Sequence, residues 1–410
     1  MSPHRTGQTA ASEFAANWPL LLSAMMGVGL ASMIPYSIGV FLGPMRQEFG
    51  WSAELILLGF SLIGIVGALS APFAGQLIKR FGARGLALAG TATLTTGTMG
   101  LAFLPPFVPA YFAIYLVIAT GQSMVSAIIW QKLIVEQFVT ARGLAVSIAL
   151  CGSNIAGAVS PILATFMIEQ AGWREGYLAL AAYMFISAFP LAWLFFHERP
   201  DQKDFGAASA AITSTGRTAH EAVRSREFWL MCVSFGFAGV GITGYIVHFV
   251  PMLRSQGFPL LLAAGVVSSL SIAALAGRLI AGAFMDRVFA PRLAALALGL
   301  PVIRSALLLV AAPSYWIALI AAVLIGLSTG AEFNMIAYLT ARFFGLRDYG
   351  TIGGIFFGVF MVGCLGGQQL PTLLLRWSGY DLVVVLFGTG FFVAAASMLF
   401  CRPYPQLDWA

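Results

Sequence analysis

The loop "GQLIKRFGAR" at residues 75–84 recurs in altered form as "GAFMDRVFAPR" at residues 282–292, and the two copies begin 207 residues apart. Two further landmarks keep this offset. Gly143 matches Gly350, and Gly172 of "GWREGY" matches Gly379 of "SGYDL". Three landmarks with one offset, in a chain of about twice that length, predict that one structural unit is duplicated.

The composition indicates that the solvent of this chain is lipid. Of its 410 residues, 59% are hydrophobic and 9% are charged, whereas a soluble domain has about 25% charged residues. A membrane helix needs about 20 mainly apolar residues. Twelve stretches qualify: 18–43, 53–76, 86–104, 108–132, 143–168, 177–196, 227–252, 259–284, 292–311, 314–340, 350–375 and 381–401.

The predicted fold is an all-α membrane protein with 12 transmembrane helices in two pseudo-symmetric six-helix bundles. We expect an N-terminal half at residues 1–196, a cytoplasmic linker at 197–226 and a C-terminal half at 227–410. Within the linker, "RTAHEAVRSREFW" favours a short amphipathic helix.

Lysine and arginine positions predict the topology. If the N-terminus is inside, the inner segments hold fifteen of these residues and the outer segments four, which favours a cytoplasmic location for both termini. We expect no nucleic-acid partner, because the net charge of +6 is spread over short loops rather than gathered on one polar face. The sequence shows no metal-ligand spacing, no nucleotide-binding motif and no nucleophile–base pair, so it predicts no cofactor and no enzymatic activity.

The repeated loop resembles a motif of major facilitator superfamily transporters. That motif reads Gly-x-Leu-Ala-Asp-Arg-x-Gly-Arg-Lys between spans 2 and 3. Its first copy here has Lys79 at the aspartate position, and the second copy keeps Asp286 but lacks the later glycine. The resemblance implies a gating loop on the cytoplasmic side, formed by Gly75, Arg80, Gly82, Gly282, Asp286 and Arg287.

A narrower resemblance lies in the second half. The segments "YIVHFVPMLRSQGF" (245–258), "GRLIAGAFMDR" (277–287) and "GAEFNMIAYLTARFFGLRDYG" (330–350) are similar to the branch that holds monocarboxylate and oxalate:formate-type transporters. In monocarboxylate transporters an arginine one turn before the second loop glycine contacts the substrate carboxylate. Arg278 stands four residues before Gly282, at the matching place. Ala274 stands where those transporters often have an aspartate, so the match is to the broad branch.

Two charged residues inside predicted spans are the strongest site candidates. Arg278 is either the anchor of an anionic substrate or a structural arginine that reaches the cytoplasm or pairs with Asp286, because a charge at this depth is costly. Glu332 is the only acidic residue well inside a span. It is either a proton carrier, or a partner of Arg278, or a fixed polar tie between helices.

The remaining candidates are uncharged at neutral pH or weakly basic. His248, near the outer end of span 7, is either a proton or substrate contact or a satisfied interfacial histidine. The resemblance implies that spans 1, 4, 7 and 10 line a central cavity, where the further candidates would lie: Tyr245, Asn334, Tyr36 and Gln122. Arg304 in span 9 has no explanation from the sequence beyond pairing or snorkelling.

The sequence thus predicts a secondary active transporter of a small organic anion, a monocarboxylate, coupled to protons and working by alternating access as a monomer. The expected location is a bacterial inner membrane. A drug or hydrophobic-compound exporter of the same fold is the alternative. Such exporters usually carry an acidic residue in the N-terminal half, and spans 1, 4 and 5 have none.

Overall fold

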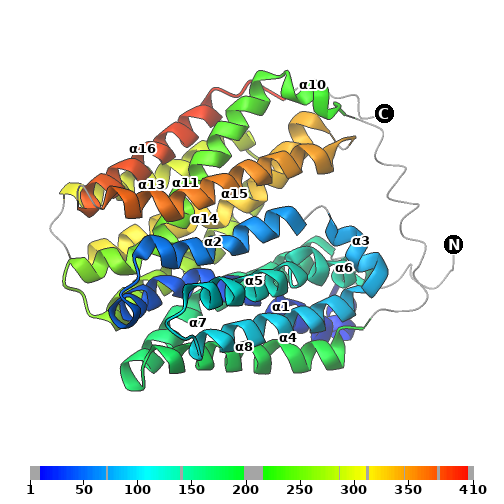
Figure 1. Cartoon of the computed structure of the whole chain (residues 1–410). Helices are drawn as coiled ribbons and strands as arrows, with labels where there is room; N and C mark the ends of the chain where they lie inside the picture. The colour runs from blue at the N-terminus through cyan, green and yellow to red at the C-terminus, as the bar shows by residue number, and fades with distance from the viewer. Residues whose placement is uncertain are drawn as a thin grey trace. The chain divides into compact units, whose positions relative to one another are not determined.

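The computed structural model describes residues 10–70, 73–138, 142–197, 216–285, 287–310, 314–345, 347–375 and 379–404, and these residues are almost entirely helical (Figure 1). The first part of the chain forms α1 (Ala10–Phe49), α2 (Ala53–Ser70), α3 (Ala74–Phe81), α4 (Ala83–Ala102), α5 (Val108–Met124), α6 (Ala127–Gln137), α7 (Arg142–Gln170) and α8 (Trp173–Phe195). The second part forms α10 (Ala219–Val223), α11 (Arg226–Ser255), α12 (Leu260–Met285), α13 (Ala290–Val310), α14 (Tyr315–Phe344), α15 (Tyr349–Leu374) and α16 (Tyr380–Leu399).

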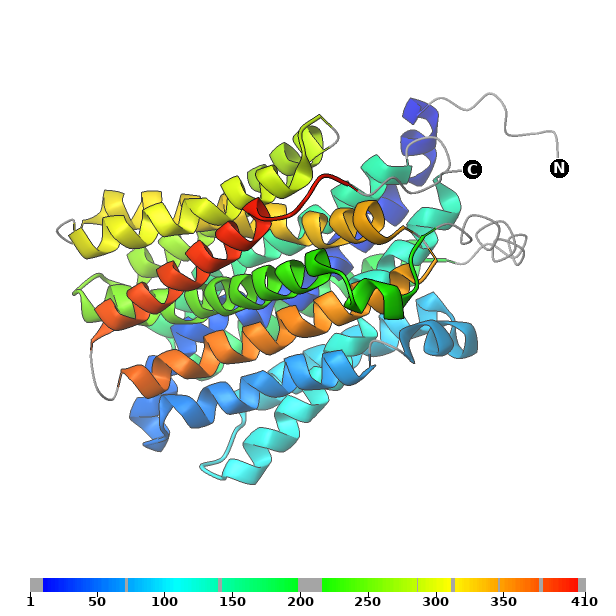
Figure 2. The same ribbon diagram turned by 90° about the horizontal axis from the view of Figure 1, so that it is seen from above.

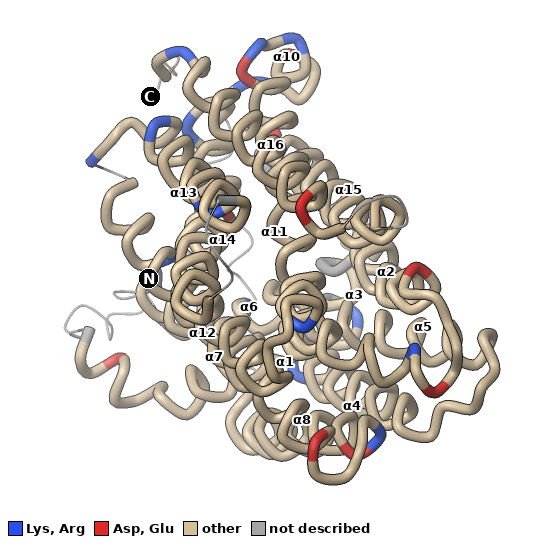
Figure 3. The backbone as a smooth tube through the Cα atoms, turned by 90° about the vertical axis from the view of Figure 1, so that its left-hand side faces the viewer, with Lys and Arg blue, Asp and Glu red and all other residues tan. Residues whose placement is uncertain are grey.

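Within the described residues, eleven helices are long and apolar enough to cross a membrane. Figure 3 shows why: the backbone is tan over most of its length, with few lysine, arginine, aspartate or glutamate positions. The predicted span that is missing from these eleven is the third, 86–104, which falls on α4. This helix has 20 residues, but its sequence "GTATLTTGTMG" is rich in glycine and threonine, which lowers its apolar character. The chain is therefore an all-α, multi-pass membrane protein.

Some element boundaries differ from those predicted. The predicted fourth span, 108–132, is divided into α5 and α6. The first helix begins at Ala10, whereas the first span was predicted to begin at residue 18. The predicted linker helix is reduced to the five residues of α10, and Arg226 already belongs to α11.

The chain divides into two compact units. The N-terminal unit comprises Met1–Ser37 and Gly59–Lys203, and the C-terminal unit comprises Ile38–Leu58 and Asp204–Ala410. The last twelve residues of α1 (38–49) and the start of α2 are thus grouped with the C-terminal helices. In two views, α11, α13, α15 and α16 of the C-terminal unit run side by side (Figures 1 and 2).

Helix packing reproduces the sequence repeat. A Cβ atom placed on Gly29 of α1 would contact Ala156 of α7, while one placed on Gly363 of α15 would overlap the carbonyl oxygen of Gly236 of α11. Gly29 and Gly236 are 207 residues apart, and so are Ala156 and Gly363. The offset found in the loops is therefore also the offset between equivalent helix contacts.

A hydroxyl–carbonyl contact repeats with the same offset. Thr98 of α4 donates to the carbonyl of Leu94 over 2.8 Å. Ser305 of α13 donates to the carbonyl of Pro301 over 2.9 Å. Thr98 and Ser305 are 207 residues apart, and so are Leu94 and Pro301. The helices α4 and α13 are therefore equivalent.

The last residues of the linker are fixed to the loop between α14 and α15. The backbone amide of Arg217 donates to Phe344 over 2.8 Å, and the amide of Ala219 donates to the Asp348 carboxylate over 2.7 Å. Thr218 and Glu221 form a capping box at the start of α10. The hydrogen bond from the Thr218 amide, supported by the charges of Arg347 and Arg217, lowers the pKa of Glu221.

The tightest helix crossing of the C-terminal unit joins α12 and α14. Three glycines make it: Cβ atoms on Gly277, Gly326 and Gly330 would overlap the backbone of the opposite helix. For Gly330 the obstacles are the Ala274 carbonyl oxygen and the Arg278 amide. Small residues allow this approach, and in lipid such packing is a main source of helix association.

We expect Gly330→Ala to lower the unfolding midpoint of the purified protein, with a loss of about 1–3 kcal/mol, because overpacking forces the two backbones apart. Gly265→Ala on α12 is the matched control, since a Cβ there meets nothing within 4 Å. Its midpoint should equal or exceed that of the wild type. Equal midpoints for the two variants would show that the crossing is looser than described.

Candidate functional site

Arg278 is held by the α12–α14 crossing. It follows Gly277, which packs against the backbone of Leu327, and its own amide faces Gly330. The arginine is 9% exposed and lies inside the apolar span Leu260–Met285. The crossing therefore fixes the backbone from which a buried guanidinium extends. A guanidinium presents a planar set of donors that matches a carboxylate.

Glu332 lies on the other helix of this crossing, two residues after Gly330. An α-helix turns about 100° per residue, so Glu332 points away from the face that contacts α12. Its side chain is 2% exposed, and neither carboxylate oxygen has a hydrogen-bond partner in the described part of the chain. It lies within electrostatic range of Cys364 on α15. Arg278 and Glu332 are thus brought to adjacent helices, but no hydrogen bond joins them.

His248 connects α11 to α15. Its Nε2 atom lies 2.9 Å from the backbone carbonyl oxygen of Gln368, and the ring is 4% exposed. If Nε2 is protonated and donates to this carbonyl, Nδ1 remains for a further proton or ligand. The contact explains how the histidine is satisfied in an apolar span.

Tyr245 belongs to a different contact, at the meeting of α11, α13 and α16. Its hydroxyl lies 2.9 Å from the Ser305 hydroxyl, and its ring centroid lies 4.6 Å from that of Phe387. The Arg304 guanidinium carbon lies 3.2 Å from the Tyr245 ring centroid and 4.5 Å from that of Phe249. Although Tyr245 and His248 are close in sequence, Tyr245 contacts α13 and α16 whereas His248 contacts α15.

The contact with the Tyr245 and Phe249 rings explains how Arg304 can be buried. The side chain is fully buried, and none of its three nitrogens has a hydrogen-bond partner among the residues described. Two aromatic faces surround its charge instead. A desolvated cation–π contact contributes about 2 kcal/mol or more, which offsets part of the cost of burying the guanidinium.

The predicted N-terminal candidates lie on α1 and α5. Tyr36 is 9% exposed. The Gln122 amide nitrogen donates to the carbonyl of Ala31 over 2.6 Å, which ties α5 to α1. The Gln122 Oε1 atom is buried and unpartnered within the described residues.

The predicted gating loops are described in part. Gly82 ends α3 with a positive φ of 73°, a conformation that favours glycine. Arg80 is exposed and lies 5.3 Å from the Phe81 ring centroid. Gly75 lies in α3, Gly282 lies in α12 with open space around it, and Arg287 is exposed. Asp286 and the side chains of Lys79 and Asn334 are outside the described residues.

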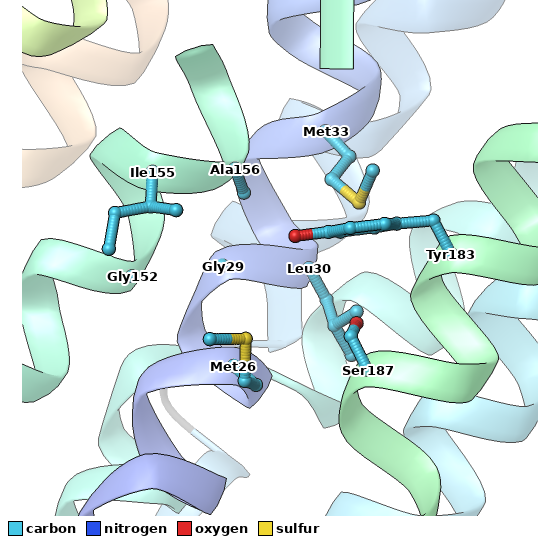
Figure 4. Close-up of a pocket in the computed structure, with 9 residues that line it drawn as sticks. All are labelled: Met26, Gly29, Leu30, Met33, Gly152, Ile155, Ala156, Tyr183 and Ser187. Carbon is cyan, nitrogen blue, oxygen red and sulfur yellow. The ribbon is translucent and has the colours of Figure 1, made fainter. Parts of the chain in front are cut away.

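A small void in the N-terminal unit lies between α1, α7 and α8 (Figure 4). Its volume is about 10 Å³, which is room for no more than one water. Gly29 and Gly152 bring α1 and α7 together beside it, and the Tyr183 ring reaches across from α8 (Figure 4). The void is a packing defect and too small for a solute.

No group of three His, Cys, Asp or Glu side chains in the described ranges could hold a metal ion. Sequence reasoning missed two features of the C-terminal and N-terminal units. The proximity of Cys364 to Glu332 depends on how α14 packs on α15, which no local pattern encodes. The interruption between α5 and α6 carries neither glycine nor proline, and its only signal is Ser126, a favoured N-cap residue.

Comparisons with known proteins agree with this architecture. Residues 21–368 match the model of the Major Facilitator Superfamily. The oxalate:formate antiporter of Oxalobacter formigenes is 24% identical over 65% of this chain and 62% of its own length. Human monocarboxylate transporter 6 is 27% identical over 39% of this chain and 32% of its own length. The matches thus cover less than two thirds of either relative.

A solved structure of a D-xylose–proton symporter superposes with a TM-score of 0.73, 14% identity and coverage of 96% of this chain and 98% of that one. The low identity limits this likeness to the fold. The family match extends over most of the chain, and the relatives are transporters. The chain therefore belongs to the Major Facilitator Superfamily and has a multi-pass, all-α membrane fold.

Proposed function

We propose that the protein is a proton-coupled secondary active transporter of a small organic anion, a monocarboxylate, that works by alternating access. The observation that carries the proposal is Arg278, a cation buried in an apolar span with its backbone fixed by a glycine crossing. Charged residues inside membrane spans are expensive and mark substrate or ion pathways. The names of the relatives, an oxalate:formate antiporter and a monocarboxylate transporter, both point to small carboxylates as the class of substrate.

In this proposal Arg278 binds the carboxylate through its planar donors. Glu332 carries the proton, because it is a buried carboxylate that no described residue holds by a hydrogen bond. His248 has one ring nitrogen engaged with Gln368 and contributes the other to the proton or the substrate. A fixed cation and an exchangeable proton together suit the movement of a negative solute with H⁺.

The proposed setting is a bacterial inner membrane with both termini in the cytoplasm, in line with the excess of lysine and arginine in the predicted inner segments. We propose that one chain is the functional unit. The predicted spans 1, 4 and 5 contain no acidic residue, and this argues against the exporter alternative.

Arg278→Gln should reduce carboxylate uptake into proteoliposomes by about tenfold or more, because it removes the charge-assisted hydrogen bonds to the substrate. The measurement is the uptake of labelled formate and oxalate, driven by an inward proton gradient. Arg254→Gln serves as control, since Arg254 is exposed and donates to the nearby Phe258 carbonyl. A folded Arg278→Gln variant with normal uptake would make this arginine structural. Movement of lipophilic cations instead of carboxylates would favour the exporter.

Glu332→Gln should separate transport from proton coupling. The glutamine keeps the shape of the side chain but cannot carry a proton, so uptake driven by a proton gradient should be lost while carboxylate exchange across the membrane continues. Both are measured in the same proteoliposomes, with Glu227→Gln in the first turn of α11 as control. Gradient-driven uptake that equals the wild type would exclude Glu332 as the proton carrier.

A further inference from the structure

A row of aromatic rings runs along one face of α8, in the N-terminal unit. The Phe185 and Phe189 rings are stacked with their centroids 4.7 Å apart, and the Trp193 centroid lies 6.4 Å from that of Phe189. Residues four apart share one face of an α-helix. Together with Pro190 and Leu194, these rings line an open, apolar groove of about 450 Å³. Ligand pockets have volumes of about 300–1,000 Å³.

The groove faces lipid rather than protein. α8 packs on α4 through a different face (Figure 1), on which Met184, Ala188 and Ala192 are fully buried. There the Thr98 hydroxyl of α4 donates to the Met184 sulfur over 3.7 Å. On the groove face, by contrast, Trp193 is 56% exposed. In an apolar membrane span, such a face is covered by acyl chains.

A positive charge lies at one end of the groove. Arg84, in the first turn of α4, has its guanidinium carbon 5.5 Å from the Trp193 ring centroid, and its Nη2 atom donates to the Trp193 carbonyl over 2.8 Å. Its Nε atom is buried without a hydrogen-bond partner, and the described part of the chain offers this arginine no ion pair. The contacts therefore hold the guanidinium in place without neutralising its charge.

The groove has about the length of one membrane leaflet. From Phe185 to Leu194 the helix rises about 14 Å, at about 1.5 Å per residue. Half of the hydrocarbon core of a bilayer is about 15 Å thick. The Trp193 end lies at the membrane interface, because tryptophan is enriched there and α8 ends two residues later, at Phe195. An acyl chain in the groove would thus bring its headgroup to Arg84.

From these observations we infer that the α8 groove and Arg84 form a binding site for an anionic phospholipid. One acyl chain lies over the rings of Phe185, Phe189 and Trp193, and the headgroup phosphate accepts hydrogen bonds from the guanidinium, whose planar donors match phosphate oxygens. A lipid with net negative charge is favoured, because a zwitterionic headgroup carries its own cation beside the phosphate. In the proposed topology the lipid belongs to the cytoplasmic leaflet, whose surface is negatively charged.

A second copy of the chain is the other candidate occupant of the groove. Symmetric dimers bring the same surface of both copies together, and two copies in one membrane have the same orientation. Both Arg84 side chains would then lie at one depth beside the interface, where like charges repel. Charge complementarity therefore favours the lipid.

The test measures the quenching of tryptophan fluorescence by lipids with brominated acyl chains. The purified protein is placed in phosphatidylcholine bilayers that contain the same small fraction of brominated phosphatidylglycerol or brominated phosphatidylcholine. Trp193→Phe keeps a ring in the groove, so the difference between its signal and that of the wild type reports on Trp193. We expect the phosphatidylglycerol to quench Trp193 at least threefold more strongly. Equal quenching by the two lipids would overturn the inference.

Substitutions of Arg84 test the headgroup contact. Arg84→Gln should abolish the preference for phosphatidylglycerol, whereas Arg84→Lys keeps the charge and should retain most of it. Arg174→Gln is the matched control, because Arg174 lies 4.4 Å from the Trp173 ring centroid at the opposite end of α8, and it should behave as the wild type. A preference that survives in Arg84→Gln would contradict the contact. The comparison of the two lipids on the wild type does not depend on whether this variant folds.

The same data distinguish lipid from a second copy. If a dimer covers the groove, quenching of Trp193 should be equal for the two lipids and should fall as the ratio of protein to lipid rises, and this result would overturn the inference. None of these readouts requires transport. The lipid site and the proposed function can therefore fail independently of each other.

Discussion

Close contact between helix backbones is the constraint on which this structure depends. In lipid, burying apolar side chains gives little net attraction between helices, so packing and small residues must supply it. Gly277, Gly326 and Gly330 supply it between α12 and α14, while Gly236 and Gly363 do so between α11 and α15. The site residues follow from these crossings, because Arg278 and Glu332 lie directly beside one of them.

Two buried charged residues of the C-terminal unit, Arg304 and Glu332, have different surroundings. Arg304 is surrounded by the rings of Tyr245 and Phe249, which attract its charge without a counter-ion. Glu332 has no such compensation among the residues described. A group that its surroundings satisfy is expected to remain fixed, whereas one left uncompensated has reason to exchange a proton. The contrast supports a structural role for Arg304 and a functional one for Glu332.

The sequence predicted the membrane architecture because hydropathy and repeats are read over long windows. The offset of 207 recurs in the contacts of Gly29 and Gly236 and in the hydroxyls of Thr98 and Ser305. It did not predict the partners of Arg304, since these come from a distant helix. Tyr245 and His248 are only three residues apart on α11, but helix packing places them against different helices, which the sequence does not reveal. The break after Met124 escaped notice because apolar residues continue through it.

Duplication explains why the two repeats differ most where chemistry is proposed. With the offset of 207, Arg278 and Glu332 correspond to Ala71 and Val125, so the first repeat has no charged residue at either position. The repeats thus diverge at the positions of the proposed charged groups, whereas the packing positions Gly29 and Gly236 keep the shared offset. In the proposed function, both charged groups therefore belong to the C-terminal unit: Arg278 attracts the anion and Glu332 carries the proton, while the repeated packing contacts keep the two units alike in fold.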